Sequence, residues 1–279
     1  MNLSVTSHLQ GFASEQQKRR VVAMMKAAGF QHIRVSAMQY PIISAKNALD
    51  LHMVLDARMG LVVVVSASDG YLLLNEKQWA DYCRKVVKWI PAGANAQVGN
   101  EWNSELFTGK GIQPDAKKAV TYYLIAADIL LSKFPKMFLI SPGVTNESKN
   151  GKGKLSARTF LSAFIDAGPS LPVSGWGLHY YHDRPDHPED LKLLKSNIAF
   201  LQKNGRGKPI ILTETGAASS GNALVWYGML RNGALPGIED AAYYCMDHHT
   251  GFQLVDDRLN PSSLYRKMAE DAKGVGGIC

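Results

Sequence analysis

Strand-like and helix-like segments alternate along the whole chain, and this order constrains the fold more than any other feature. The strand segments are short, apolar and rich in β-branched or aromatic residues, and amphipathic helical patterns separate them. Residues 61–65 read Leu-Val-Val-Val-Val and are apolar on both faces, as expected of a strand that is covered on both sides. The predicted strands are residues 3–9, 32–38, 61–66, 94–101, 137–142, 173–181, 209–215 and 241–247, and the predicted helices are residues 14–28, 44–58, 76–89, 114–135, 156–167, 188–203, 223–230 and 261–272.

Eight strand–helix units in this order predict a parallel sheet with crossover helices. The chain has 279 residues, and closed α/β barrels run to roughly 250 residues as one domain. We therefore expect an α/β protein with a single (β/α)8 TIM barrel over residues 1–279. A doubly wound Rossmann sheet is the alternative, but the G-x-G-x-x-G turn that it requires after the first strand is absent.

The composition excludes several classes of partner. The net charge is +7, from 31 Lys and Arg against 24 Asp and Glu, but the basic residues are spread along the helices and form no long run. Nucleic acid is therefore not expected as a partner, and neither is a membrane, because no apolar stretch of about 18 residues occurs. Cys83, Cys245 and Cys279 match no zinc or redox motif. We expect a monomer. Because the N-terminus lacks a signal-peptide pattern, we also expect a cytoplasmic location by default, or export by another route.

In a (β/α)8 barrel the active site lies at the C-terminal ends of the strands, so polar residues there are informative. Two of these ends carry a glutamate directly on an apolar strand, Glu101 in AQVGNEW and Glu214 in PIILTETG. A carboxylate at such a position is costly unless it is paired or functional. Two carboxylates that face each other across a cleft are what glycoside hydrolysis requires. The other polar strand ends are Arg34, Ser36, Asp69, Asn100, residues 145–147, His179, Tyr181, Asp247 and His248.

Each of these residues also has a simpler interpretation. Glu101 would suit the start of a following helix, Glu214 would suit a structural partner of a basic residue, and Arg34 would suit a simple ion pair. His179 and Tyr181 share one face of a strand and would suit a hydrogen bond within the core. A metal-dependent hydrolase is another alternative, since Asp247, His248, His249, His182, Asp183 and His187 cluster after two strands. That site lacks an H-x-H on the first strand and a ligand set with fixed spacing, so we predict no metal site. The G-x-S-x-G elbow of serine hydrolases and the P-loop are also absent.

With Asn100-Glu101 at the end of the fourth strand and Glu214 at the end of the seventh, the chain resembles the retaining glycoside hydrolases of the large (β/α)8-barrel clan. That clan includes cellulases, mannanases, β-xylosidases and β-galactosidases. The segment MDHHTGFQLVDDRLNPSSLYRKM is similar to the last strand and loop of these enzymes. The resemblance implies that Glu101 is the acid/base and Glu214 the nucleophile. It also implies substrate-binding or supporting roles for Asn100 (sugar 2-hydroxyl), for His179 and Tyr181 (a His-x-Tyr pair whose tyrosine orients the nucleophile) and for Arg34 (beneath the nucleophile).

Many members of the clan carry a tryptophan near the end of the eighth strand as a floor for the sugar ring, and this chain reads YYCMDHH there. Trp102, Tyr181 or Trp226 is then expected to supply the stacking surface, and Asp247 a further substrate contact. The resemblance predicts a glycosidase that cleaves a poly- or oligosaccharide by a retaining mechanism without a cofactor. The positive charge and the lysines of residues 147–154 suggest an anionic polysaccharide. An inactive carbohydrate-binding barrel and a metal-dependent barrel hydrolase remain as alternatives.

Overall fold

The computed structural model describes residues 1–9, 12, 14–39, 45–67, 70–109, 111–181, 188–217, 219–244, 253–256 and 258–275. Its strands form one eight-stranded parallel sheet in the order β5-β4-β3-β2-β1-β8-β7-β6. The strands are β1 (Asn2–Ser7), β2 (His32–Gln39), β3 (Gly60–Ser66), β4 (Asn95–Val98), β5 (Leu139–Ile140), β6 (Trp176–Tyr181), β7 (Ile210–Gly216) and β8 (Ile238–Tyr243). Isolated parallel bridges, Ile140 with Gly175 and Val144 with Leu178, join the two outer strands.

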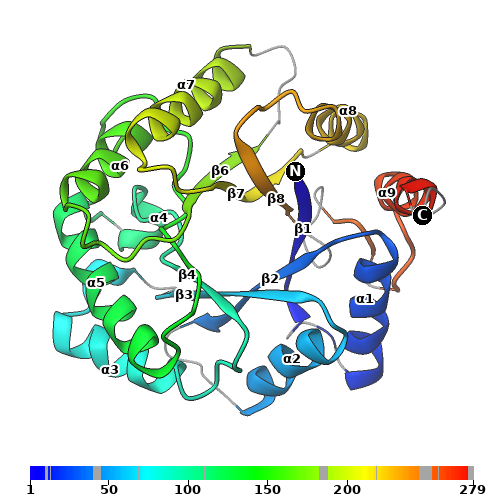
Figure 1. Cartoon of the computed structure of the whole chain (residues 1–279), viewed down its shortest axis with the longest axis horizontal. Helices are drawn as coiled ribbons and strands as arrows, with labels where there is room; N and C mark the ends of the chain where they lie inside the picture. The colour runs from blue at the N-terminus through cyan, green and yellow to red at the C-terminus, as the bar shows by residue number, and fades with distance from the viewer. Residues whose placement is uncertain are drawn as a thin grey trace.

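Helices surround this sheet, and the prediction of a (β/α)8 barrel is confirmed (Figure 1). They are α1 (Glu15–Ala27), α2 (Ala45–Asp56), the short 3-10 helix η2 (Tyr71–Leu73), α3 (Glu76–Val86), α4 (Glu105–Thr108), α5 (Ala116–Lys133), α6 (Ala157–Asp166), α7 (Pro188–Asn204), α8 (Ser220–Arg231) and α9 (Ser263–Val275). Ser14 caps α1 as its sequence position predicts, because its side chain accepts a hydrogen bond of 3.2 Å from the backbone N–H of Gln17. None of the described helices is long and apolar enough to cross a bilayer.

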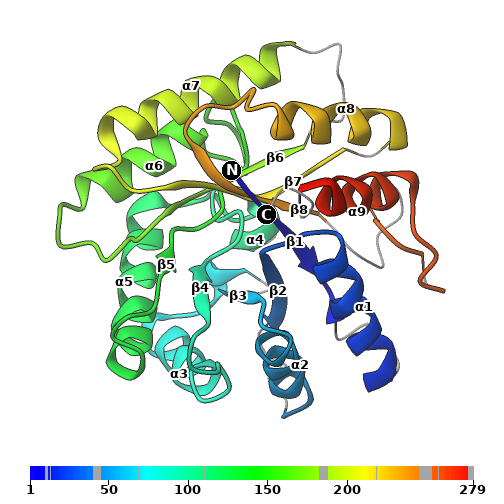
Figure 2. The ribbon, with the colours of Figure 1, turned by 45° about the vertical axis from the view of Figure 1, so that its right-hand side comes forward.

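The last helix lies beside the first and completes the outer ring (Figures 1 and 2). The hydroxyl of Tyr265 on α9 donates a hydrogen bond of 3.0 Å to the backbone carbonyl of Met24 on α1. At Gly29, just after α1, an added Cβ would lie 2.8 Å from the Cβ of Ala272. The glycine that ends α1 therefore also lets α9 approach closely.

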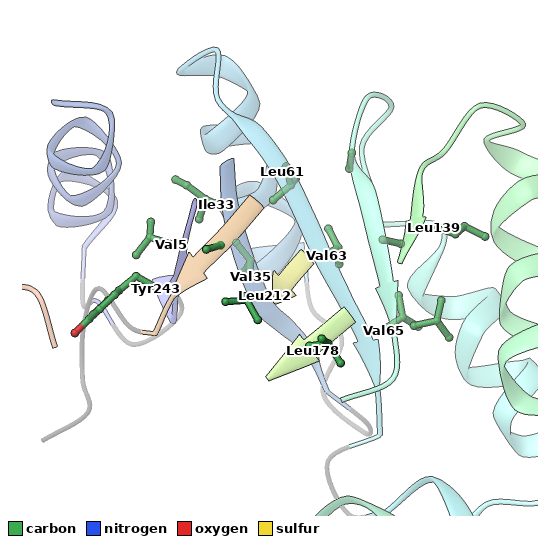
Figure 3. Close-up of a cluster of buried hydrophobic side chains, with 14 of the residues drawn as sticks. Val5, Ile33, Val35, Leu61, Val63, Val65, Leu139, Leu178, Leu212 and Tyr243 are labelled. Carbon is green, nitrogen blue, oxygen red and sulfur yellow. The ribbon is translucent and has the colours of Figure 1, made fainter. Parts of the chain in front are cut away.

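Side chains alternate along the first part of β1, β2 and β3 and divide the core in two. Several odd-numbered residues are buried aliphatic side chains that pack between the strands and the helices; Figure 3 shows Val5, Ile33, Val35, Leu61, Val63 and Val65 among them. Even-numbered neighbours face the barrel interior, where they line a cavity of about 260 Å³ at its N-terminal end; they include Ser4, His32, Arg34 and Val62. The interior of this barrel is therefore unusually polar, and the same alternation that fills the outer core points Arg34 inward.

The strand boundaries differ from prediction in several places, among them β4, β5 and β8. β4 ends at Val98, not at residue 101, because Gly99 and Glu101 both adopt positive φ angles, 92° and 48°, that no strand accommodates. β5 is reduced to Leu139–Ile140, and β8 begins at Ile238, before the predicted residue 241. The remainder of the predicted eighth strand, residues 245–247, lies outside the described residues.

Candidate active site

The structure brings Glu101, Glu214 and His179 together at the C-terminal ends of β4, β7 and β6. One carboxylate oxygen of each glutamate and one ring nitrogen of His179 all lie within 4.8 Å of one another. The side chains of Glu101 and Glu214 are only 13% and 10% exposed. The two glutamates that the sequence singled out thus share one desolvated site, although they are 113 positions apart (214 minus 101).

Glu214 is held by donors from β2, across the barrel interior, and from the adjacent strand β6. The Arg34 guanidinium donates from Nη1 to Oε1 at 2.7 Å, and the hydroxyl of Tyr181 donates to Oε2 at 2.5 Å. Nδ1 of His179 lies 3.6 Å from the same Oε2. Burial by itself would raise the pKa of Glu214, but the charges of His179 and Arg34 and the two hydrogen bonds outweigh it and hold that pKa below its ordinary value. Glu214 is therefore kept ionised.

The same contacts keep the Tyr181 hydroxyl protonated. Burial is the largest cause that raises the pKa of Tyr181, and the adjacent negative charge and hydrogen bond of Glu214 raise it further. Tyr181 is thus a hydrogen-bond donor to Glu214, and its role in orienting this glutamate for catalysis stays a prediction.

Glu101 has a different environment. Its Oε1 lies 2.8 Å from Nδ1 of His179, and its backbone N–H donates to the carbonyl of Gly143 at 2.7 Å. At Gly143 an added Cβ would lie 2.1 Å from Nε2 of His179, so only glycine leaves room for the imidazole at this position. Glu101 itself has the left-handed backbone conformation, with φ of 48°, at the turn that follows β4.

Arg34 connects these groups beneath the site. It is 1% exposed, and each of its three guanidinium nitrogens donates a hydrogen bond. Nη1 donates to Glu214, Nη2 to Oδ1 of Asn100 at 2.7 Å, and Nε to Oε1 of Gln97 at 2.8 Å. Asn100 therefore lies at the site as predicted. Sequence reasoning missed Gln97, although it alternates with the apolar Ala96 and Val98 and shares the inward face of β4 with Asn95, which was a usable signal.

The aromatic residues differ from the expectation. Trp102 and Trp226 are fully buried: Trp102 stacks on Tyr71 at a centroid distance of 4.3 Å, and Trp226 donates from Nε1 to Oγ1 of Thr215 at 2.7 Å. A ring with no exposed surface cannot stack on a sugar in this conformation, so both tryptophans fill the core here. Tyr181 is half-buried, and the half-buried ring of Tyr244, just after β8, meets it edge to face at 6.0 Å.

Tyr244 was not predicted, and it stands one residue beyond the end of β8, where the clan's tryptophan was sought. Its ring also meets that of His8, which follows β1, edge to face at 5.7 Å. These contacts place the tyrosine rings at the C-terminal end of the barrel strands.

Several predicted residues cannot be placed. Asp247, with His248 and His249, lies outside the described residues, as do Asp69, Cys245, Cys279 and the cluster His182, Asp183 and His187. The side chain of Ser36 is also not described. Thr145 to Glu147 follow β5, and there Oδ1 of Asn146 accepts a hydrogen bond from Asn197 on α7.

Within the described residues, the group compact enough to hold a metal is the same trio of Glu101, His179 and Glu214. Its contacts are those of a hydrogen-bonded set, with the Arg34 guanidinium already 2.7 Å from Glu214. That fixed positive charge opposes the binding of a cation at the same carboxylate. We therefore assign the trio no metal.

No protein-family model matches the sequence, and no curated protein matches it. Solved structures do. A GH128 (subgroup II) endo-β-1,3-glucanase from Sorangium cellulosum is similar with a TM-score of 0.67 and 17% identity, over 96% of this chain and 98% of that one. An endo-1,4-β-mannanase from Rhizomucor miehei is similar with a TM-score of 0.67 and 10% identity, over 98% and 95%.

An endo-1,4-β-D-mannanase from Thermotoga petrophila is similar with a TM-score of 0.64 and 13% identity, over 98% of this chain and 99% of that one. At such low identity these likenesses show the fold alone. Fold and site together define a (β/α)8 barrel with a buried pair of glutamates at the C-terminal ends of β4 and β7. The particular fold is the one found in (β/α)8-barrel glycoside hydrolases that cleave glucans and mannans.

Proposed function

We propose that this protein is a retaining glycoside hydrolase in which Glu214 is the nucleophile and Glu101 the acid/base. The observation that carries the proposal is the spacing and environment of the two glutamates. Their nearest side-chain oxygens in the trio lie within 4.8 Å of each other. Retaining enzymes hold their carboxyl groups about 5–5.5 Å apart and inverting ones roughly 6.5–9.5 Å apart, since inversion needs room for a water. The short separation supports retention.

The neighbours divide the roles. Arg34 and Tyr181 bind Glu214 and keep it negative, which suits attack on the anomeric carbon. Among the described residues, Glu101 contacts no arginine, and its Oε1 lies 2.8 Å from Nδ1 of His179. In the first step Glu214 forms an ester bond to the anomeric carbon while the glycosidic bond breaks and Glu101 gives its proton to the leaving oxygen. In the second step Glu101 takes a proton from water, the hydroxide attacks the same carbon, and Glu214 leaves as a carboxylate.

β-Linked glucans and mannans are the first substrates to test, because the structural neighbours are named as an endo-β-1,3-glucanase and endo-1,4-β-mannanases. The exposed Lys149 and Lys152 in the loop after β5, with the net charge of +7, add anionic polysaccharides to the panel. The chemistry uses only side chains and water, so no cofactor takes part in the proposed steps.

Trapping of the covalent intermediate tests the proposal. A 2-deoxy-2-fluoro glycoside with a good leaving group should add one glycosyl mass to the protein, on the peptide that contains Glu214. Glu214→Gln should lose the adduct, and Glu101→Gln should lose turnover of substrates with poor leaving groups, while Tyr123→Phe on α5 serves as a control distant from the site. Full turnover in both glutamine variants would exclude the proposal. Binding without turnover by the wild type would indicate a carbohydrate-binding barrel, and loss of turnover with a chelator would indicate a metal-dependent hydrolase.

A further inference from the structure

Gln97 is a fully buried amide on β4, and both ends of its side chain are used. Oε1 accepts a hydrogen bond of 2.8 Å from Nε of Arg34, and Nε2 donates one of 2.8 Å to the backbone carbonyl of Gly99. The first contact reaches β2 and the second returns to the turn after β4. An amide has one acceptor and one donor group, so it can satisfy both partners at once, whereas an ionised carboxylate of the same length can only accept.

The two contacts lead to the two glutamates by different routes. Through Arg34, Gln97 is connected to Glu214, which accepts from Nη1 at 2.7 Å. Through Gly99, it is connected to the turn that presents Glu101, where residues 99 and 101 have φ angles of 92° and 48°. That turn is also tight: a Cβ at Gly99 would lie 2.7 Å from the ring of Trp102.

We infer that Gln97 is a positioning residue that couples the acid/base turn to the arginine–nucleophile pair, so that one buried amide fixes the relative placement of Glu101 and Glu214. This inference rests on the proposed function. Without the amide, Nε of Arg34 loses an acceptor inside the barrel, and the Gly99 carbonyl loses a donor. Buried groups left without partners are costly, and both groups then reorient. Reorientation of Arg34 loosens its hold on Glu214, and reorientation of the turn moves Glu101.

The test compares Gln97→Met with Thr6→Val. Methionine keeps the length of the side chain but makes neither hydrogen bond. Thr6 is the matched control, because it is fully buried, pairs with Arg34 in the β1–β2 register, and its Oγ1 has no hydrogen-bond partner among the described residues. In Gln97→Met we expect kcat to fall by about 10–100-fold with a smaller change in KM, since displacement of reacting groups by about 1 Å costs this much. Thr6→Val should keep the wild-type values.

The pH profile separates a positioning role from a purely structural one. The groups that face Glu214 are Arg34, His179, Tyr181 and Glu101. If Arg34 loosens, the acidic limb of kcat/KM, where Glu214 takes up a proton, should move to higher pH by about one unit. A variant that is merely less stable would lose active protein without moving this limb. Near-UV circular dichroism and the melting temperature report whether Gln97→Met is folded.

Gln97→Glu is the second variant if the methionine variant does not fold. It keeps an acceptor for Arg34 but has no N–H for Gly99, and its charge competes with Glu214 for the guanidinium, so the same limb should again move up. An unchanged limb and an unchanged kcat in the folded variant would overturn the inference.

A ¹³C NMR titration of the glutamate carboxyls without substrate keeps the two proposals apart. A raised pKa of Glu214 in the Gln97 variant supports the coupling. If that result is found but the wild type hydrolyses no glycan, only the proposed function is refuted. If the wild type is active but the pKa of Glu214 is the same in wild type and variant, only the coupling is refuted.

Discussion

Replacing Tyr181 with phenylalanine removes a single hydroxyl that donates to Oε2 of Glu214 at 2.5 Å. A hydrogen bond to a charged group contributes about 1.5–3 kcal/mol to stability. One unit of pKa corresponds to about 1.4 kcal/mol. Loss of this bond should therefore raise the pKa of Glu214 by about one to two units, and the acidic limb of the kcat/KM profile should move up by the same amount.

The sign of the stability change follows from the same linkage. The pKa of Glu214 in the folded protein lies below its ordinary value, in spite of burial, because of His179, Arg34 and Tyr181. The stability that these partners give is present above the ordinary carboxyl pKa and is lost as the pH falls through the lowered one. Tyr181→Phe should therefore lower the free energy of unfolding by about 1.5–3 kcal/mol at pH 7, and the loss should shrink towards about pH 3.

Urea unfolding at pH 7 and pH 3 measures the stability change, and initial rates across the pH range measure the limb. The control is Tyr123→Phe, which removes another buried hydroxyl, one that donates to the neutral carbonyl of Pro172 at 3.2 Å. Its loss should be independent of pH. A Tyr181→Phe protein with a wild-type acidic limb, or with an equal loss of stability at the two pH values, would refute the argument that Tyr181 controls the charge of Glu214.

Three further perturbations test other parts of the structure. The pKa of His32 is raised chiefly by its hydrogen bond to Asp240. The stability that this contact gives is therefore present below the ordinary imidazole pKa and is lost as the pH rises through the pKa of the folded protein. His32→Gln should lower the free energy of unfolding, measured in urea, by about 0.2–1 kcal/mol near pH 5.5 and hardly at all near pH 9. Gly143→Ala should reduce kcat by about 100-fold, measured on the best substrate found, because the new Cβ would lie 2.1 Å from Nε2 of His179; wild-type turnover would show that the imidazole can move without harm. Trp102→Ala should lower the free energy of unfolding by about 3–5 kcal/mol, since the ring is fully buried, and a loss below 1 kcal/mol would contradict its place in the core.

The barrel was predictable because its causes are local. Apolar runs such as residues 61–65 appear at regular intervals, helical patterns separate them, and a chain with this order closes in few ways. The glutamate pair was predictable for a related reason: parallel strands bring their C-terminal ends to one face, so Glu101 and Glu214 had to lie on the same side of the barrel. Neither argument requires knowledge of which side chains touch.

The place of Trp102 depended on contacts that the sequence does not display. It follows Glu101 directly, which suggested a position at the substrate. The left-handed backbone at Gly99 and Glu101 reverses the chain there and turns the indole inward, onto the ring of Tyr71 in η2. The partner is 31 positions away in the sequence (102 minus 71), in a helical turn that was not predicted. When the backbone leaves the strand, as it does here, the sequence position of a residue next to a catalytic candidate does not predict where its side chain points.

The two glutamates differ through their neighbours more than through their own positions. Glu214 lies on a strand and receives an arginine and a tyrosine hydroxyl, whereas Glu101 lies on a turn and meets His179. The donors to Glu214 come from β2 and β6, and the orientation of Arg34 depends in turn on Gln97 in β4. The charge of Glu214 is thus a property of the barrel interior, where three strands combine to hold this carboxylate negative. The sequence indicates which carboxylates meet, but only the packed interior determines which of them receives the arginine and the tyrosine hydroxyl.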